Sequence, residues 1–290
     1  MKKALQVSLI ILPIVGGAFA GYLYWKKSSD EQASLQRQVP PPPAASPASA
    51  PNPPLVPESA KIIESPAPKG PSLPPLGKSD PFMLESIAHL TKNRSSMRLF
   101  NDENLITHIV STIDNLLRQN IPANGLPVDV PEGGFMVRDQ AGVLSIDPAN
   151  SARYAPYMRL VDAVDAKAVV SLYLEAYPLL QEAYEQLGHP GQYFNARLLA
   201  VLDDLIKAPE ISPPIPLVQR HVLYQFSDDD LENRSAGQKM MIRLGLSNER
   251  KLKAKLEAIR SELMRHLQHD ETRTGQAPPP TSPAAPALRP

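Results

Sequence analysis

Asp114 is the first residue whose type and position could support chemistry. It falls at the edge of an apolar stripe that repeats at helical spacing, so we expect its carboxylate to be half-buried. A half-buried carboxylate needs a partner, and an arginine can bind it through two parallel hydrogen bonds. Arg153, Arg159 and Arg197 are the candidate partners. The pattern predicts an internal polar clamp, with a ligand site or a catalytic carboxylate as the alternatives.

Tyrosines are the second chemical feature of the chain. Seven of the nine lie between Tyr154 and Tyr224, and Tyr173, Tyr177 and Tyr184 recur on one face of a predicted helix. Such rings either complete a core, with their hydroxyl groups reaching polar partners, or line a groove that stacks glycans or peptides. We favour the core and keep the groove as the alternative.

The familiar motifs of enzymes and metal sites are missing from the sequence. There is no cysteine, which excludes disulfides, thiolate nucleophiles and cysteine-bound metals. The six histidines form no HExxH pair, and no GxSxG, P-loop or GxGxxG motif occurs. Asp203 and Asp204 are adjacent and would diverge on a helix. We therefore predict no catalytic residue, no metal and no cofactor, and favour a binding protein over an enzyme.

These residues must be positioned by one domain, because proline sets the rest of the chain apart. Of the 33 prolines, 14 lie between Ser28 and Asp80 and six in the last twenty residues, so both stretches are predicted to be disordered. About 190 residues remain, enough for a sizeable core. The predicted organisation is an anchor at 1–27, a Pro/Ala/Ser-rich linker at 28–79, a mainly helical domain at 80–270 and a Pro-rich tail at 271–290.

The N-terminal segment has the features of a membrane anchor. Ala4 to Trp25 carries no charge, and a helix of that length spans ~33 Å, enough for a ~30 Å hydrocarbon core. We predict an uncleaved single-pass helix, with a secretory signal cleaved after Ala20 as the alternative. The three-residue head favours a periplasmic domain over a cytoplasmic one. Gly17 and Gly21 form a GxxxG motif and are a candidate homodimer seam.

The domain itself is predicted to be mainly α, a bundle of helices with one small hairpin. Asp80 is expected to cap the first helix, Asn101 or Asp102 the second, Asp165 a long central helix and Ser247 the last. The other predicted helices and strands are a second helix ending near Asn120, helices at 151–164, 165–187, 192–207 and 236–244, a hairpin of 135–137 and 143–146 around a five-residue loop, and a candidate third strand at 221–226.

Charge divides the domain into an acidic body and a basic end. Residues 80–238 contain 12 Lys and Arg against 21 Asp and Glu, whereas residues 239–269 contain 8 against 3. The last two helices are therefore expected to dock on the body, with a basic face for a partner as the alternative. The apolar seam from Leu252 to Leu263 would pack on the domain or on a second copy. Because the domain is acidic overall, we expect no nucleic-acid partner.

Several motifs, in this order and spacing, resemble a proteobacterial family known as domain of unknown function 3014, over about residues 76–267. They are Asp114-Asn115-Leu116, Arg153-Tyr154, Tyr173-x-x-x-Tyr177-Pro178-Leu179, Ala183-Tyr184-x-x-Leu187-Gly188, Phe194-Asn195-x-Arg197-Leu198, Leu231-Glu232 and Gly237-Gln238-Lys239. The resemblance implies a membrane-anchored bacterial envelope protein and supplies no known activity. The binding candidates that it adds are Asn115, Tyr154, Gln238 and Lys239. Thr107-His108 stand where the family has basic residues, which weakens any role for charge there.

The sequence as a whole predicts a non-enzymatic, membrane-tethered periplasmic domain that binds or scaffolds an envelope protein or polymer at the bacterial inner membrane. One alternative is an enzyme acting on peptidoglycan or another envelope polymer. The other is a cytoplasmic-facing membrane adaptor. The expected partners are the membrane, an envelope component and a second copy joined through Gly17 and Gly21 or through the C-terminal helix.

Overall fold

Long helices dominate the computed structural model, which describes residues 73–92, 94–121, 125–220 and 223–274. The elements are η2 (Leu76–Lys78), α2 (Asp80–Thr91), η3 (Arg94–Leu99), α3 (Leu105–Asn115), β1 (Val137–Gln140), β2 (Val143–Ile146), α4 (Asn150–Arg153), α5 (Ala155–Ala163), α6 (Ala166–Gln186), α7 (Phe194–Ile206), β3 (Leu217–Arg220), β4 (Leu223–Phe226), α8 (Asp229–Glu232), α9 (Ala236–Arg243) and α10 (Leu246–Thr274). The mainly helical prediction is confirmed.

The predicted membrane helix, with Gly17 and Gly21, lies outside the described residues, and so does most of the linker. Among the residues that the structure describes, no helix combines the length and the apolar character that crossing a bilayer requires. Leu73 and Leu76, from the end of the predicted linker, pack against the main core.

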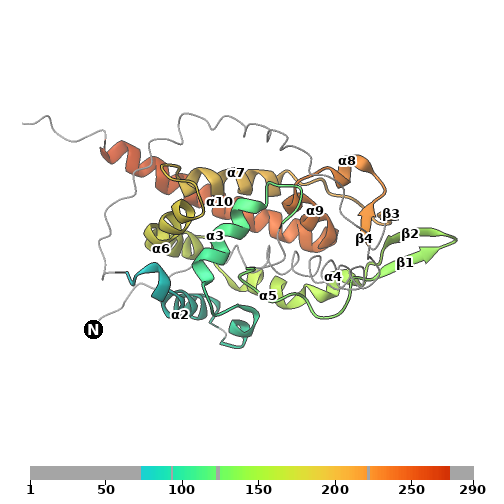
Figure 1. The fold of residues 1–290 in the computed structure, drawn as a ribbon, viewed down its shortest axis with the longest axis horizontal. Helices are drawn as coiled ribbons and strands as arrows, with labels where there is room; N and C mark the ends of the chain where they lie inside the picture. The colour runs from blue at the N-terminus through green and yellow to red at the C-terminus, as the bar shows by residue number, and fades with distance from the viewer. Residues whose placement is uncertain (1–72, 93, 122–124, 221–222, 275–290) are drawn as a thin grey trace, which may run out of the picture.

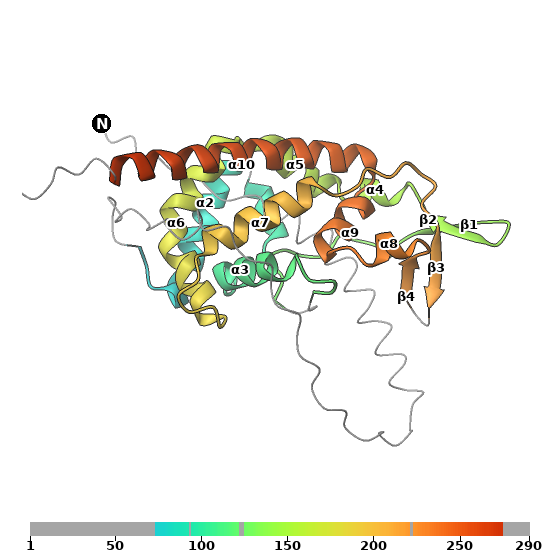
Figure 2. The ribbon, with the colours of Figure 1, turned by 90° about the horizontal axis from the view of Figure 1, so that it is seen from above.

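The helix α6 belongs to the main core and is packed by α2, α3, α7 and α10. Its two apolar faces are both buried, as the two stripes in its sequence predict. Asp165 caps it as expected, because its carboxylate accepts hydrogen bonds from the N–H groups of Lys167 and Ala168. α3 and α10 both pack on α6. Figures 1 and 2 show α10 running along one side of the molecule, with α2 and α6 toward one end and both hairpins at the other.

Asp80 does not cap its own helix, contrary to the prediction. α2 begins at Asp80 itself, and Ser79 is its N-cap residue. The Asp80 carboxylate instead accepts hydrogen bonds of 2.8 Å from the N–H groups of Asn104 and Leu105. It thereby satisfies the free donors at the start of α3 and replaces the local cap expected at Asn101 or Asp102.

Three further helix boundaries differ from the prediction. The helix expected over 151–164 is divided into α4 and α5 at Tyr154, because Pro156 has no N–H to continue the hydrogen-bond ladder. α3 ends at Asn115, not near Asn120. α10 begins at Leu246, directly after Gly245 in a left-handed conformation, so Ser247 lies inside the helix and is not its cap.

The first hairpin is confirmed, but its turn is tighter than predicted. β1 pairs antiparallel with β2, and the register places Gln140 opposite Val143. The predicted five-residue loop is therefore a two-residue turn at Ala141 and Gly142, both with positive φ. Such a turn follows the right-handed twist of the strands, which explains why the ladder continues to its end.

The candidate third strand belongs to a second hairpin, in which β4 pairs antiparallel with β3. His221 and Val222 lie outside the described residues. The hairpins meet at an isolated bridge between Ser145 and Pro216, where the Ile146 N–H donates to the Ile215 carbonyl at 3.0 Å. A small second core lies beneath them, formed by Ile146, Ile215, Leu217, Phe226, Leu231 and Ile242.

The basic end of the domain docks on the acidic body within the same chain. In the described residues five ion pairs cross this junction: Lys239–Glu232, Arg250–Glu210, Lys253–Glu210, Lys251–Asp162 and Arg260–Asp203. Leu252, Leu256, Ile259 and Leu263 are buried beneath α10 in the main core. The C-terminal seam therefore packs on its own domain and is not an open surface for a second copy.

Candidate functional site

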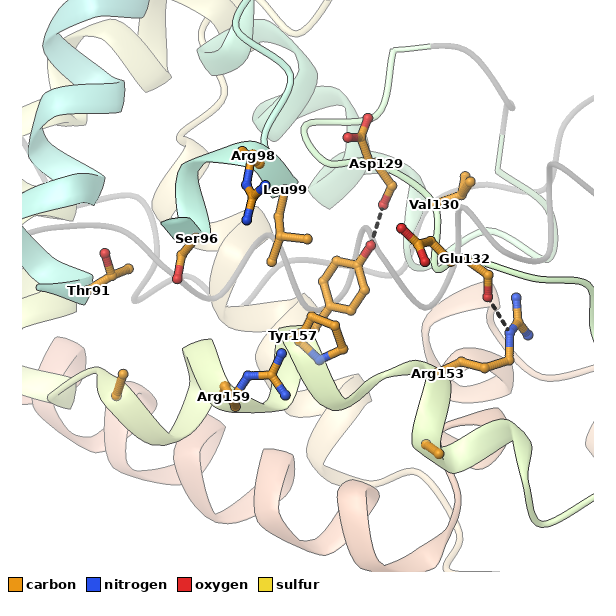
Figure 3. A pocket seen from close by; sticks show the side chains of 13 residues that line it. Thr91, Ser96, Arg98, Leu99, Asp129, Val130, Glu132, Arg153, Tyr157 and Arg159 are labelled. Carbon is orange, nitrogen blue, oxygen red and sulfur yellow. Dashed lines mark hydrogen bonds between the residues drawn. The ribbon is translucent and has the colours of Figure 1, made fainter. Parts of the chain in front are cut away.

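A cleft of about 860 Å³ lies between three segments that are far apart in the sequence. One wall is η3 with the end of α2, another is the loop at 129–132, and the third is α4 with α5 (Figure 3). The lining residues are Thr91, Ser96, Arg98, Leu99, Asp129, Val130, Glu132, Ala152, Arg153, Pro156, Tyr157, Arg159 and Ala163.

Hydrogen bonds hold two of the walls of the cleft together. The Asp129 N–H donates to the Leu99 carbonyl at 2.9 Å, and the Asn101 N–H donates to the Pro127 carbonyl at 3.0 Å. The Asn101 side chain adds a bond of 2.7 Å to the Leu126 carbonyl. η3 and the loop therefore form one connected backbone unit.

Tyr157 connects the third wall to the same loop. Its hydroxyl donates to the Asp129 carbonyl at 2.8 Å, and the residue is 2% exposed (Figure 3). Burial raises the pKa of the Tyr157 hydroxyl, and the nearby Asp129 carboxylate raises it further. The hydroxyl therefore stays protonated at neutral pH and acts as a hydrogen-bond donor.

Arg153, a predicted site residue, lines the cleft but is committed to the backbone. Its guanidinium donates to the carbonyls of Pro131, Glu132 and Gly133, at 3.2, 3.0 and 2.6 Å. It therefore shapes the loop and is a positioning residue. Its neighbour Tyr154 is buried, and this burial raises the pKa of the Tyr154 hydroxyl.

Four other charged side chains line the cleft: Arg98, Arg159, Asp129 and Glu132. All four are exposed. Within the described part of the chain, no side-chain hydrogen bond or ion pair involves any of their charged groups. These groups are therefore available to a ligand, in contrast to the guanidinium of Arg153.

The predicted clamp forms around Asp114, which does not line the cleft. Its side chain is 7% exposed, and its Oδ1 lies 3.0 Å from Arg197 Nε and 3.4 Å from His189 Nε2. Arg118 approaches the other oxygen at 3.3 Å, and Arg197 also donates to the Asp114 backbone carbonyl. The cluster joins α3, the turn after α6 and α7, which is the arrangement expected of an internal clamp.

Sequence reasoning found one of the three clamp partners. Arg197 is confirmed as a partner, whereas Arg153 and Arg159 lie in the cleft. Arg118 could have been found from its spacing of four residues from Asp114 on a helix. His189 gave no signal, because its position depends on how the turn after α6 folds back. It stacks on Tyr184 with ring centroids 4.4 Å apart.

The tyrosines of α6 belong to the core and not to a groove. Tyr173, Tyr177 and Tyr184 are each less than 5% exposed. The Tyr173 hydroxyl donates to the Asn195 side chain, and the Tyr177 hydroxyl donates to Gln181 Oε1 at 3.0 Å. Burial raises the pKa of Tyr177 to about 12. These three rings are therefore part of the hydrophobic core, which is the interpretation that the sequence favoured.

The remaining candidates also have partners inside the domain. Asn115 donates to the Ser111 carbonyl at 2.7 Å. Gln238 donates to Asp204 Oδ1 at 2.9 Å, and burial raises the pKa of that carboxyl. Lys239 is 3.1 Å from Glu232 Oε1. Among the described residues, no group of three or more His, Asp or Glu side chains is placed to hold a metal ion.

The fold and the cleft define a mainly helical domain with a mixed-charge cleft and an internal ionic clamp. The family described as protein of unknown function (DUF3014) matches residues 105–260, more than half of the chain. The chain belongs to this family, as the resemblance in its motifs predicted. The matched region contains the clamp and two of the three cleft walls. Comparison with curated proteins and with solved structures gives no match.

Proposed function

We propose that the chain is a non-enzymatic, membrane-tethered module that binds or scaffolds a component of the bacterial cell envelope through the cleft. The observation that supports this most strongly is the cleft itself, with its four charged side chains that have no side-chain partner in the described part. Its volume lies within the range of ~300–1,000 Å³ that is typical of small-ligand sites. Because hydrogen bonds already hold the walls, binding would require little additional ordering.

The N-terminal sequence supports a tether at the inner membrane. The uncharged run from Ala4 to Trp25 is long enough to span a bilayer. The Pro-rich stretch from Ser28 to Asp80 would reach ~160 Å if fully extended. This combination suits a domain that works at a distance from its anchor in the periplasm.

An enzyme acting on an envelope polymer is the second candidate, because Asp129 and Glu132 line the same cleft. Hydrolysis of a polymer by two carboxylates requires that both converge on the bond to be cleaved. In Figure 3 the Asp129 carboxylate points away from Tyr157, and Arg98 and Arg159 lie on the other side of the cleft. This arrangement favours binding over hydrolysis.

Topology and capture together test the proposal. C-terminal fusions to alkaline phosphatase and to a fluorescent protein that matures only in the cytoplasm report the side of the membrane. Phosphatase activity without fluorescence is expected, and the reverse would support the cytoplasmic adaptor. Crosslinked envelope extracts should then yield a component retained by the full chain and lost from a variant carrying Arg98→Gln, Arg159→Gln, Asp129→Asn and Glu132→Gln. Equal retention by that variant would overturn the cleft as the binding site.

A further inference from the structure

The charges of the cleft are separated by sign. Arg98 on η3 and Arg159 on α5 come from opposite walls, and Figure 3 shows both guanidinium groups extending toward the space between them. Asp129 and Glu132 both belong to the loop that forms the remaining wall. One part of the cleft therefore holds two guanidinium groups that have no side-chain partner among the described residues, and the loop holds two such carboxylates beside the backbone-bound guanidinium of Arg153.

The positive part suits one planar oxyanion. A guanidinium offers a rigid set of N–H donors that matches the two oxygens of a carboxylate. Two guanidinium groups on facing walls can bind such a group from both sides. Among the described residues, neither the Arg98 nor the Arg159 guanidinium has a hydrogen bond or an ion pair, so neither group must give up a protein partner first.

The negative part argues against a ligand that carries only negative charge. Asp129 and Glu132 offset the two arginines, so these four side chains have no net charge. A polyanion would be repelled by the two carboxylates, and this repulsion selects against it. A ligand with an ammonium group at a fixed distance from its carboxylate would satisfy both parts.

The surface between the two parts is partly apolar. Leu99, Val130 and Pro156 line it, together with the buried ring of Tyr157. This surface suits the backbone and small side chains of a short peptide. A peptide with a free amino group and a free carboxylate carries both charges at its ends.

We propose, as a refinement that rests on the proposed function, that the cleft binds a short zwitterionic peptide. Its carboxylate lies between Arg98 and Arg159, and its ammonium group lies toward the loop that carries Asp129 and Glu132. Arg153 holds the loop at 131–133 and does not contact the carboxylate. The ligand class is therefore an amine-bearing and carboxylate-bearing peptide, free or attached to a polymer.

The test titrates the detergent-solubilised full chain with three forms of trialanine, followed by ligand-detected NMR. The forms are the free peptide, its N-acetyl derivative and its C-terminal amide. The free peptide should bind best, and each blocked form should bind about tenfold more weakly, because each lacks one charge-assisted interaction. Inorganic phosphate is the probe for a simple anion site and should compete only weakly.

Two paired variants assign each end of the peptide. The variant with both Arg98→Gln and Arg159→Gln should bind the free peptide about tenfold more weakly, and it should bind the free peptide and the amide with equal affinity. The variant with both Asp129→Asn and Glu132→Gln should bind the free and the acetylated peptides with equal affinity. Arg220→Gln and Glu257→Gln are the matched controls on exposed residues outside the cleft, and they should leave all three affinities unchanged.

Three results would overturn the zwitterion assignment: no binding of free trialanine, equal binding of all three forms, or phosphate binding that exceeds peptide binding. Because the comparison of peptide forms uses the unaltered chain, it does not depend on whether a variant folds. If envelope capture still requires the cleft, the proposed function would stand and only the ligand class would fail. If capture is independent of all four charged side chains, the proposed function itself fails.

Discussion

Replacement of Asp114 by Asn tests the ionic clamp most sharply. The substitution keeps the size of the side chain and removes its charge. Arg197 and His189 would then lack their anionic partner at a site where the Asp114 side chain is only 7% exposed. The Arg197 guanidinium would then remain beside the junction of α3 with α7 without a carboxylate partner.

The structure sets the expected size of the effect. Removing one partner of a buried ion pair costs about 3–5 kcal/mol. Arg197 and His189 are 24% and 25% exposed and can regain some solvation, so we expect a loss of about 2–3 kcal/mol. Arg118 is 60% exposed, and its replacement by Ala should cost less than about 0.5 kcal/mol.

Urea unfolding of the full chain, followed by circular dichroism at 222 nm, measures these losses. A double-mutant cycle of Asp114→Asn with Arg197→Gln should give a coupling energy of about 1–2 kcal/mol. If Asp114→Asn costs no more than Arg118→Ala, or if the cycle shows no coupling, the clamp does not stabilise the domain and the reasoning is wrong.

Three further predictions concern packing and pH. Gly237→Ala should destabilise the domain by about 1–2 kcal/mol in urea unfolding, because the added Cβ would lie 2.7 Å from Leu205 Cδ2. Gly245→Ala should lower the free energy of unfolding by at least about 1 kcal/mol, because φ is +83° and the Cβ would lie 2.1 Å from Ser151 Oγ. Removing that oxygen in a Ser151→Ala background should recover only part of the lost stability. Full recovery would refute the contribution of backbone strain. Burial lowers the pKa of His108 below 6.5, so the folded state binds fewer protons than the unfolded state and stability should fall as pH drops from 7.5 to 5.5. His108→Asn should lose less stability over that interval, and an equal loss in both proteins would contradict the assignment.

Local signals explain which parts of the fold could be predicted. The cap at Asp165 lies directly before its helix, and the two apolar stripes of α6 repeat along one continuous segment. Both are properties of neighbouring residues, and both are confirmed. The hairpin was found for the same reason, although the conformation of Ala141 was not evident from its residue type, because alanine rarely adopts a positive φ.

Contacts between distant segments explain what the sequence did not reveal. Asp80 caps a helix that begins 25 residues later, and nothing in its surroundings indicates this role. His189 reaches Asp114 only because the turn after α6 folds back toward α3. The cleft depends in the same way on three segments, so Arg98, Asp129 and Glu132 gave no joint signal.

Site-specific photocrosslinking in living cells tests the central proposal most directly. A photoreactive residue at Ser96 would place the probe in the lining of the cleft, and one at Glu257 would place it on an exposed part of α10. The account predicts crosslinks to an envelope component from position 96 that disappear when Arg98 and Arg159 are both changed to Gln. Equal crosslinking from both positions, or crosslinks from position 96 that survive those substitutions, would contradict it.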